Sequence, residues 1–219
     1  MDIPAPTSAT RWAPLDPSSA AELFARAPVR WWLSGGTALD HWLGRAVQER
    51  PRTSVSTIRH DLAVLLDVLP AGLSAWAPAE AGDGCWQKVS AMDEDADLQR
   101  VWIHDDGAGV WTLQVNVEDG AERAWMYRRD PRLQLPWDVA VLDIAGLPTG
   151  APEVQLIWKA LRPTPEDDAD KDAVLPRLSE DARARWERAL LSIHPHSSWA
   201  IHVRSPVFPA KASWRGRGR

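Results

Sequence analysis

The sequence predicts an α+β fold in which a mixed sheet is followed by a helical C-terminal part. Three observations support this prediction. Short apolar runs bounded by turn residues dominate residues 29–127, which is typical of strands. After Pro148 the apolar residues recur with a helical period, behind three helix-start signals. A length of 219 residues suits one core domain with a small helical appendage.

The first part of the chain alternates helices and strands. The expected elements are, in order, an irregular arm at 1–17, helix 20–27, strand 29–33, helix 37–43, strands 55–58 and 61–66, and helix 69–76. Ser18 and Ser19 are favourable residues for beginning the first helix, and Pro28 stops it. Gly44 ends the second helix, because helices commonly finish on a left-handed residue.

The middle and the end of the chain differ in their periodicity. Strands are expected at residues 86–89, 100–104, 110–118 and 124–127, and helices from Pro152, from Pro165, and from Ser179 to about Ile193. Turn residues such as Asp119-Gly120 separate the strands. Proline in a first helical turn, followed by acidic residues, favours a helix start. We therefore divide the chain into a core at 18–148, a helical part at 149–204 and a flexible tail at 205–219.

Composition excludes several classes of function. The net charge of −5 offers no basic surface for nucleic acid, and no apolar run is long enough to span a membrane. The first residues lack the features of a signal peptide, so a cytoplasmic protein is expected. Cys85 is the single cysteine; it is expected to be a small hydrophobe, without a disulfide or a cysteine-based zinc site. The 14 Trp, against one Tyr and two Phe, predict a cavity lined by indoles.

Three stretches carry motifs in a fixed order. Residues 32–45 read WLSGGTALDHWLGR, residues 125–132 read WMYRRDPR, and residues 151–160 read APEVQLIWKA, followed by DDAD and VLPRL. Together they resemble the aminoglycoside-type enzymes of the bacterial nucleotidyltransferase superfamily. The resemblance covers about residues 29–199. It implies a polymerase-beta-like mixed sheet flanked by helices.

The resemblance also implies a two-metal site. Family members bind ATP or GTP with two magnesium ions, held by an Asp-x-Asp pair on one strand and a third acid on a neighbouring strand. The gap-free match places Arg59 in the first acid position and Asp61 in the second. The Arg and the His that precede the family's acids fall on Val55 and Thr57, and the third acid falls on Gln114. A guanidinium repels a divalent ion, so we expect no metal and no nucleotide cofactor.

Alternation along a strand assigns faces to the candidate residues. Arg59 and Asp61 would share a face, as a charge pair that orients a substrate or as a structural ion pair. Gln114 and Asn116 alternate onto one face, which the resemblance directs into the cleft; a solvated strand edge is the alternative. Glu118 continues this alternation, but its place beside a turn predicts exposure.

The remaining candidates come from the glycine turn and the C-terminal motif. Ser34, Gly35 and Gly36 could bind an anion at a helix N-terminus, although a tight turn needs glycine in any case. Lys159 matches a lysine that would face the nucleotide in the family; an exposed helical lysine is the alternative.

These observations leave three hypotheses for function. The first is a repurposed fold that binds or transforms a small, partly apolar molecule, as in natural-product tailoring, without metal or nucleotide. The second is a magnesium-dependent nucleotidyltransferase that modifies an aminoglycoside-like hydroxyl. The third is a catalytically silent interaction partner. The expected partner is a small-molecule ligand or substrate, with neither nucleic acid nor membrane, for a monomer or a homodimer.

Overall fold

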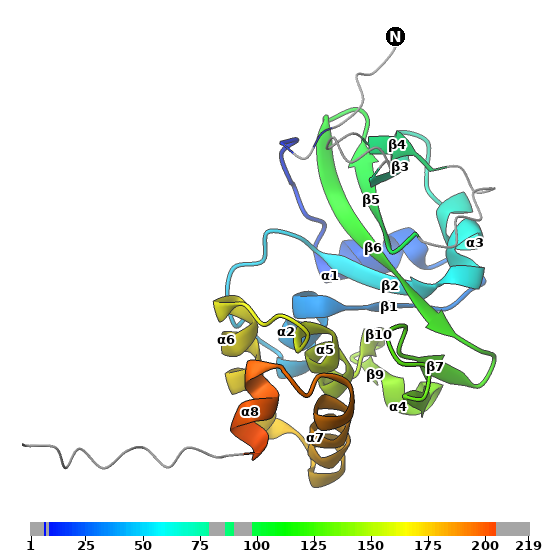
Figure 1. Ribbon diagram of the computed structural model, residues 1–219. Coiled ribbons are helices and arrows are strands. Elements are labelled where there is room, and N and C mark those ends of the chain that lie inside the picture. Colours follow the sequence, from blue (N-terminus) through cyan, green and yellow to red (C-terminus); the bar gives the residue numbers. More distant parts are fainter. Residues whose placement is uncertain (1–6, 8, 79–85, 90–97, 205–219) are drawn as a thin grey trace, which may run out of the picture.

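The computed structural model describes residues 7, 9–78, 86–89 and 98–204. Cys85 and the tail expected at residues 205–219 lie outside this part. The structure confirms the predicted α+β class: a mixed sheet is flanked by helices (Figure 1). Among the described residues, no helix combines the length and the apolar character needed to cross a bilayer.

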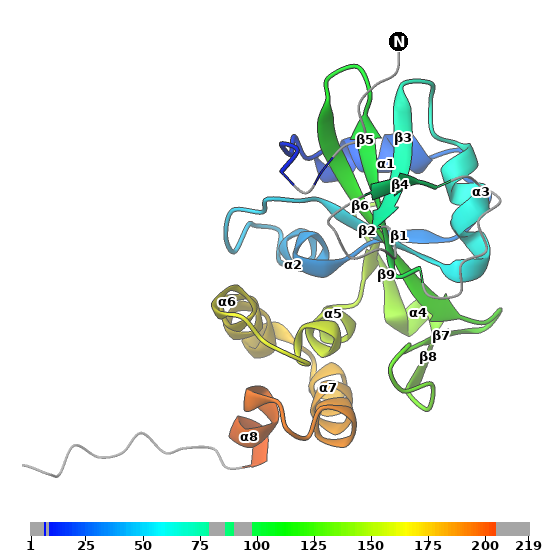
Figure 2. The ribbon, with the colours of Figure 1, turned by 45° about the horizontal axis from the view of Figure 1, so that its top comes forward.

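The helices follow the chain from α1 to α8. They are α1 (Pro17–Phe24), α2 (Gly35–Leu43), α3 (Leu62–Asp67), α4 (Trp137–Ala140), α5 (Pro152–Lys159), α6 (Pro165–Val174), α7 (Glu180–Ile193) and α8 (Ser198–Arg204). In two views, α5 to α8 gather at one end of the molecule, away from strands β3 to β5 (Figures 1 and 2).

The strands form one sheet. They are β1 (Trp31–Leu33), β2 (Ser54–Ile58), β3 (Leu73–Pro78), β4 (Trp86–Lys88), β5 (Arg100–Asp105), β6 (Val110–Gly120), β7 (Ala124–Met126), β8 (Gln134–Pro136), β9 (Val141–Ile144) and β10 (Leu147–Gly150). Their order is β4-β3-β5-β6-β2-β1-β10-β9, and β7 joins the end of β6 to β8. β1 is parallel to β10 and β2 is parallel to β6, whereas the other pairs are antiparallel.

One face of the sheet packs against α1 and α3. Strand register places Leu33 beside Val55 and Val55 beside Val115, and all three are fully buried. With the helices they belong to one apolar core, whose members are Ala20, Phe24, Leu33, Ala38, Val55, Leu62, Leu65, Leu66, Ala75, Val101, Ile103, Leu113, Val115 and Val117. Because side chains alternate along a strand, the residues between these point to the other face.

The other face carries polar side chains and indoles. Ser54 pairs with Gln114, and Gln114 pairs with Trp102 across the sheet. Two residues further along β2 and β6, on the same face, Ser56 pairs with Asn116, and Asn116 pairs with Arg100. This face is the one on which the candidate site lies.

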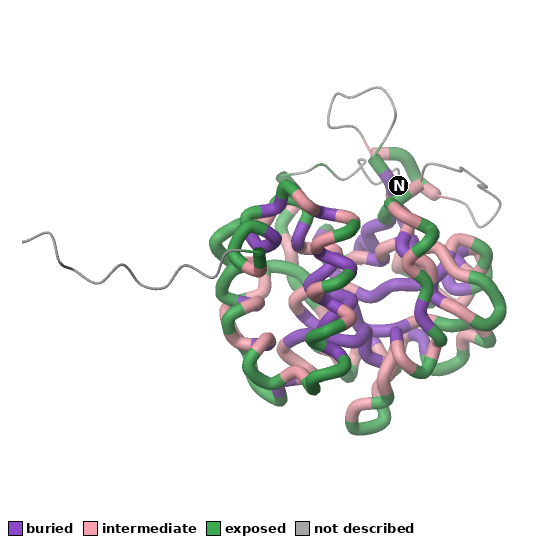
Figure 3. The backbone as a smooth tube through the Cα atoms, turned by 60° about the horizontal axis from the view of Figure 1, so that its bottom comes forward, coloured by how far each residue is buried: buried purple, intermediate pink, exposed green. Residues whose placement is uncertain are grey.

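A second apolar core joins the far end of the sheet to the C-terminal helices. Its largest fully buried members are Trp32, Trp125, Tyr127, Trp186 and Trp199. Figure 3 shows buried segments, in purple, in the interior and exposed ones, in green, around the outside. The large indoles therefore join the sheet to its helical part.

Two of the predicted elements were wrong. Residues 61–66 were expected to be a strand, but a 3-10 turn (Arg59–Asp61) and helix α3 occupy this segment. The buried residues of α3 are Leu62, Leu65 and Leu66, a helical spacing that a continuous apolar run concealed. Residues 69–76 were expected to be a helix, but Gly72 has a φ of +97° and β3 begins directly after it.

Candidate functional site

A cleft of about 750 Å³ opens where β5 and β6 approach the start of α2 and helix α5. Its lining residues are Ser34, Gly35, Pro78, Leu98, Gln99, Arg100, Gln114, Asn116, Val117, Glu118, Arg128, Arg129, Gln155 and Trp158. The structure thus brings together four residues predicted from the sequence, Ser34, Gly35, Gln114 and Asn116. The other four, Gly36, Arg59, Asp61 and Lys159, are not among the residues that line it.

A chain of hydrogen bonds runs along the floor of the cleft. The Trp102 indole Nε1 donates to Oε1 of Gln114 (3.0 Å), and Nε2 of Gln114 donates to Oδ1 of Asn116 (2.8 Å). Nδ2 of Asn116 then donates to the buried Ser34 hydroxyl (3.0 Å). An indole N–H can only donate, so Trp102 fixes the orientation of both amides.

The strand register places residues other than Arg59 and Asp61 beside Gln114. The resemblance puts the third acid on Gln114, whose partner on the neighbouring strand is Ser54, and Ser56 follows two residues later on the same face. Arg52 precedes β2, and its guanidinium carbon lies 4.9 Å from the centroid of the Trp102 ring. An Asp-x-Asp pair on β2 beside Gln114 would therefore occupy positions 54 and 56, and the Arg and the His that precede the family's acids would fall on Arg50 and Arg52.

The residues that the sequence placed there lie elsewhere. Arg59 and Asp61 belong to the 3-10 turn after β2, not to a strand face. Nε of Arg59 lies 4.0 Å from Oδ1 of Asp119, so Arg59 pairs with this residue. A five-residue shift, from 59 to 54 and from 61 to 56, also shortens the segment that must follow Arg45. The length of that segment was the signal in the sequence for such a shift.

The glycine turn is held by protein groups. Gly35 has a φ of +59°, a conformation that favours glycine. Its backbone N–H donates to Oε1 of Gln155 on α5 at 2.7 Å. The N–H that the family resemblance would direct to a phosphate is therefore already bound within the chain. This contact also fixes α5 against the start of α2.

Gly36 is required by a neighbouring side chain. A Cβ atom at this position would lie 2.5 Å from Nη1 of Arg50. The Arg50 guanidinium therefore packs directly against the backbone of Gly36. This packing explains the second glycine without a bound anion.

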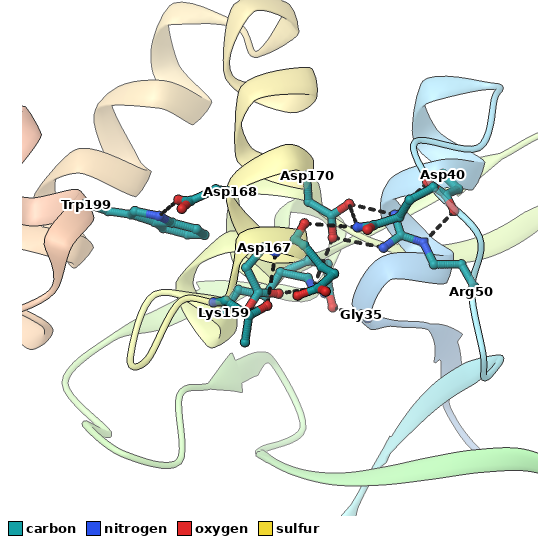
Figure 4. Close-up of polar contacts among 12 residues, drawn as sticks. Gly35, Asp40, Arg50, Lys159, Asp167, Asp168, Asp170 and Trp199 are labelled. Carbon is teal, nitrogen blue, oxygen red and sulfur yellow. Dashed lines mark hydrogen bonds and ion pairs between the residues drawn. The ribbon is translucent and has the colours of Figure 1, made fainter.

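Arg50 is the centre of an ion-pair network between α2 and α6 (Figure 4). Its guanidinium donates to both oxygens of Asp40 (2.7 Å each) and to both oxygens of the fully buried Asp170 (2.7 and 3.1 Å). Asp40 and Asp170 hold the pKa of Arg50 above its usual range against the effect of burial. Lys159 joins the network through Asp167 (2.6 Å) and Asp170 (3.1 Å), so its ammonium group binds neighbouring carboxylates.

Glu118 is a buried carboxylate in the wall of the cleft. Its exposed fraction is 3%, whereas the sequence predicted an exposed residue; this prediction was wrong. Burial raises the pKa of Glu118, although hydrogen bonds from the indoles of Trp125 (2.5 Å) and Trp158 (3.2 Å) favour the charged form. Glu118 is therefore an acceptor for indole N–H groups.

Four indoles gather beside the cleft. Trp86 stacks on Trp102 with ring centroids 4.1 Å apart, and Trp12 and Trp111 lie within 5.0 and 5.3 Å of Trp102. The backbone N–H of Ala13 donates to the Trp111 carbonyl and the N–H of Trp111 donates to the Arg11 carbonyl, and these bonds hold the N-terminal arm on β6. These rings pack against one another, and among the described residues lining the cleft the single indole is Trp158.

Metal ligands are sparse in this part of the molecule. Within residues 7, 9–78, 86–89 and 98–204, no group of three or more His, Cys, Asp or Glu side chains is arranged to hold a metal ion. The positions that the resemblance would give to three acids on β2 and β6 carry the neutral groups Ser54, Ser56 and Gln114, with the cation Arg52 two residues before Ser54. This donor set does not fit two magnesium ions, which prefer anionic oxygen ligands.

Comparisons with known proteins find similarity in structure only. No family model and no curated protein matches the chain. The lincosamide antibiotic adenylyltransferase LnuA, with lincomycin bound, has a TM-score of 0.48 and 13% identity, over 74% of this chain and 96% of that chain. Two structures of the antibiotic-resistance factor ANT(2'')-Ia, one of them in complex with adenylyl-2''-tobramycin, have TM-scores of 0.39.

The two ANT(2'')-Ia structures are 15% and 14% identical to this chain. The first match covers 87% of this chain and the second 86%, and each covers 89% of ANT(2'')-Ia. These neighbours are lincosamide and aminoglycoside nucleotidyltransferases. At these identities the similarity concerns the fold alone.

Proposed function

We propose that this chain is a nucleotidyltransferase-fold protein that has lost two-metal nucleotide transfer and uses its cleft to bind a small, partly apolar molecule. The observation that carries the proposal is the register of β2 and β6, in which Ser54 and Ser56 share a face and pair with Gln114 and Asn116. We assign Ser54, Ser56 and Gln114 to the three acid positions, and Arg52, two residues before Ser54, adds a positive charge beside them. Two unit charges about 4 Å apart interact by roughly 4 kcal/mol at an effective dielectric constant near 20, and a divalent ion doubles the repulsion. Since Arg52 is exposed, solvent weakens this repulsion without reversing its sign.

The glycine turn supports the same proposal. In a nucleotide site, the N–H groups at the start of a helix are available to phosphate oxygens. Here Gln155 occupies the N–H of Gly35, and Gly36 packs against Arg50. The turn thus has a structural role that is independent of a triphosphate.

The cleft itself suits a small molecule. Its volume of about 750 Å³ falls in the usual range for ligand sites. Pro78, Leu98, Val117 and Trp158 supply apolar surface, and the amides on the floor supply a few fixed polar groups. This mixture is typical of sites that orient an organic ligand.

Calorimetry with the full chain tests the proposal. ATP and GTP are titrated at millimolar concentration, once with magnesium and once with EDTA, and pyrophosphate release is followed in the presence of an aminoglycoside or a lincosamide. We expect no magnesium-dependent heat and no pyrophosphate. Magnesium-dependent binding together with release of pyrophosphate would establish the nucleotidyltransferase instead.

A further inference from the structure

The floor of the cleft presents hydrogen-bond donors. Each amide nitrogen of Gln114 and Asn116 carries two hydrogens, and one of each is used in the chain that begins at Trp102. The amide oxygens accept from Trp102 and Gln114. Ser34 accepts from Asn116 through its oxygen, so its own hydrogen can donate. The floor therefore keeps three hydrogens that can donate to a ligand, one each on Gln114, Asn116 and Ser34, and each of the three oxygens keeps one lone pair.

The rim of the cleft is cationic. Arg100 and Arg129 line it, and Arg52 lies at its edge, where Arg52 and Arg100 approach the same Trp102 ring at 4.9 and 5.7 Å. Arg52, Arg100 and Arg129 make no ion pair with a carboxylate among the residues that the structure describes. The indole face stabilises and orients the two guanidinium groups beside it.

The cleft contains little negative charge to balance these arginines. Glu118 is the one carboxylate among the described lining residues, and its Oε2 accepts from two indoles. Burial also raises its pKa, which disfavours the charged form. Burial lowers the pKa of Arg52, and the positive charge of Arg100 lowers it further. The second effect is expected for two cations that lack an anion between them.

From this arrangement we infer that the cleft is a metal-independent receptor for a phosphate monoester of a small, partly apolar molecule. The inference rests on the proposed function and names its ligand class. Guanidinium groups bind phosphate oxygens through paired, charge-assisted hydrogen bonds. Donors on the floor and cations on the rim surround the tetrahedral phosphate from several sides. The apolar lining at Leu98, Val117 and Trp158 would receive the organic part.

Four simple probes separate the possible ligand classes. Phenyl phosphate, inorganic phosphate, benzoate and benzylamine are titrated into the full chain by calorimetry with EDTA present. We expect phenyl phosphate to bind most tightly and benzylamine not to bind, and we expect added salt to weaken binding. Tighter binding of benzoate than of phenyl phosphate would identify a carboxylate site and overturn the assignment. Binding of benzylamine alone, or of no probe at millimolar concentration, would also overturn it.

Variants locate the binding site. Arg100→Gln and Arg129→Gln each remove one rim cation, and we expect about a tenfold or larger loss of affinity for phenyl phosphate. Arg129 follows β7 and, unlike Arg100, makes no cation–π contact with Trp102, so its substitution keeps the test valid if Arg100→Gln disturbs the packing of the indoles around Trp102. Arg26→Gln is the matched control, because Arg26 is an exposed residue after α1, on the other side of the sheet. Equal affinity in all three variants would refute the site.

The outcomes distinguish this inference from the proposed function. Binding of a neutral or cationic small molecule in the cleft, without phosphate binding, would contradict the ligand class and leave the proposed function standing. Magnesium-dependent turnover of ATP would contradict the proposed function itself.

Discussion

Substitution of Arg50 tests how the helical part is held against the sheet. Arg50→Met removes four hydrogen bonds, two to Asp40 and two to Asp170. Breaking a buried ion pair from one side costs about 3–5 kcal/mol. Asp170 keeps Lys159 and Gln48 as partners, and the side chain of Arg50 is 18% exposed, so we expect a smaller loss. The free energy of unfolding should fall by about 2–3 kcal/mol, and the melting temperature by roughly 5–10 °C.

The pH dependence of this loss gives a second measurement. Hydrogen bonds and charge from Arg50 and Lys159 hold the pKa of Asp170 below its usual 3.8, against the effect of burial. A lowered pKa in the folded chain contributes stability that is present above 3.8 and is lost as the pH falls through the folded value. The cost of Arg50→Met should therefore shrink at acidic pH.

Chemical denaturation at neutral and acidic pH provides both numbers. The control is Arg183→Met, which breaks an exposed pair between Arg183 and Glu187 (3.0 Å). Such a surface pair contributes about 0.3–0.5 kcal/mol. An equal loss in Arg50→Met and Arg183→Met, or a loss that does not change with pH, would refute the structural role given to Arg50.

Three further substitutions test single residues. Gly36→Ala places a methyl group against the Arg50 guanidinium, and we expect it to lower the free energy of unfolding by about 1–3 kcal/mol; an equal loss in the Arg50→Met background would contradict this cause. Burial raises the pKa of Glu118, so its contribution to stability falls as the pH rises above its usual 4.5. Glu118→Gln should therefore gain stability relative to the unchanged chain between about pH 4 and about pH 7, and denaturation curves with a constant difference would argue against it. Burial, with the charge of Arg129, lowers the pKa of His194, which is hydrogen-bonded to the Tyr127 hydroxyl (2.9 Å). Below about pH 6.5 the unfolded chain therefore binds a proton at His194 more readily than the folded chain does, so the free energy of unfolding should fall. The variant His194→Gln should flatten this part of the pH profile.

Much of the fold is predictable from local signals. The Gly35-Gly36 turn, the strands at 100–104 and 110–118, and the helix from Pro152 all appear where turn residues, alternation and proline predict them. The segment at 61–66 was misassigned because a short apolar run fits a strand and a buried helix equally well. Only the packing of α3 on the sheet resolves that ambiguity.

The candidate site was less accessible to sequence reasoning. Ser54 and Gln114 become neighbours through a parallel strand pairing across 60 positions of the chain, and register of this kind is set by tertiary contacts. The partnership of Arg50 with Asp170, separated by 120 residues, leaves no local pattern. Ser54 and Ser56 were overlooked because they carry no charge, although placing the acid pair at 54 and 56 requires a shorter insertion after Arg45.

Restoring the acids tests the central claim about these positions most directly. In the variant Ser54→Asp, Ser56→Asp, Gln114→Asp, three carboxylates would lie on one face of the neighbouring strands β2 and β6. The matched control is Arg59→Asp, Gln114→Asp, which keeps the native Asp61 and places three acids at the positions that sequence alone suggested. Manganese(II), followed by electron paramagnetic resonance, serves as the probe for magnesium, and melting curves confirm that both variants fold.

We predict that the variant with acids at 54, 56 and 114 binds manganese(II), and that the control and the unchanged chain do not bind it in the cleft. Binding by the control but not by the first variant would contradict the assignment of Ser54, Ser56 and Gln114 to the lost metal site.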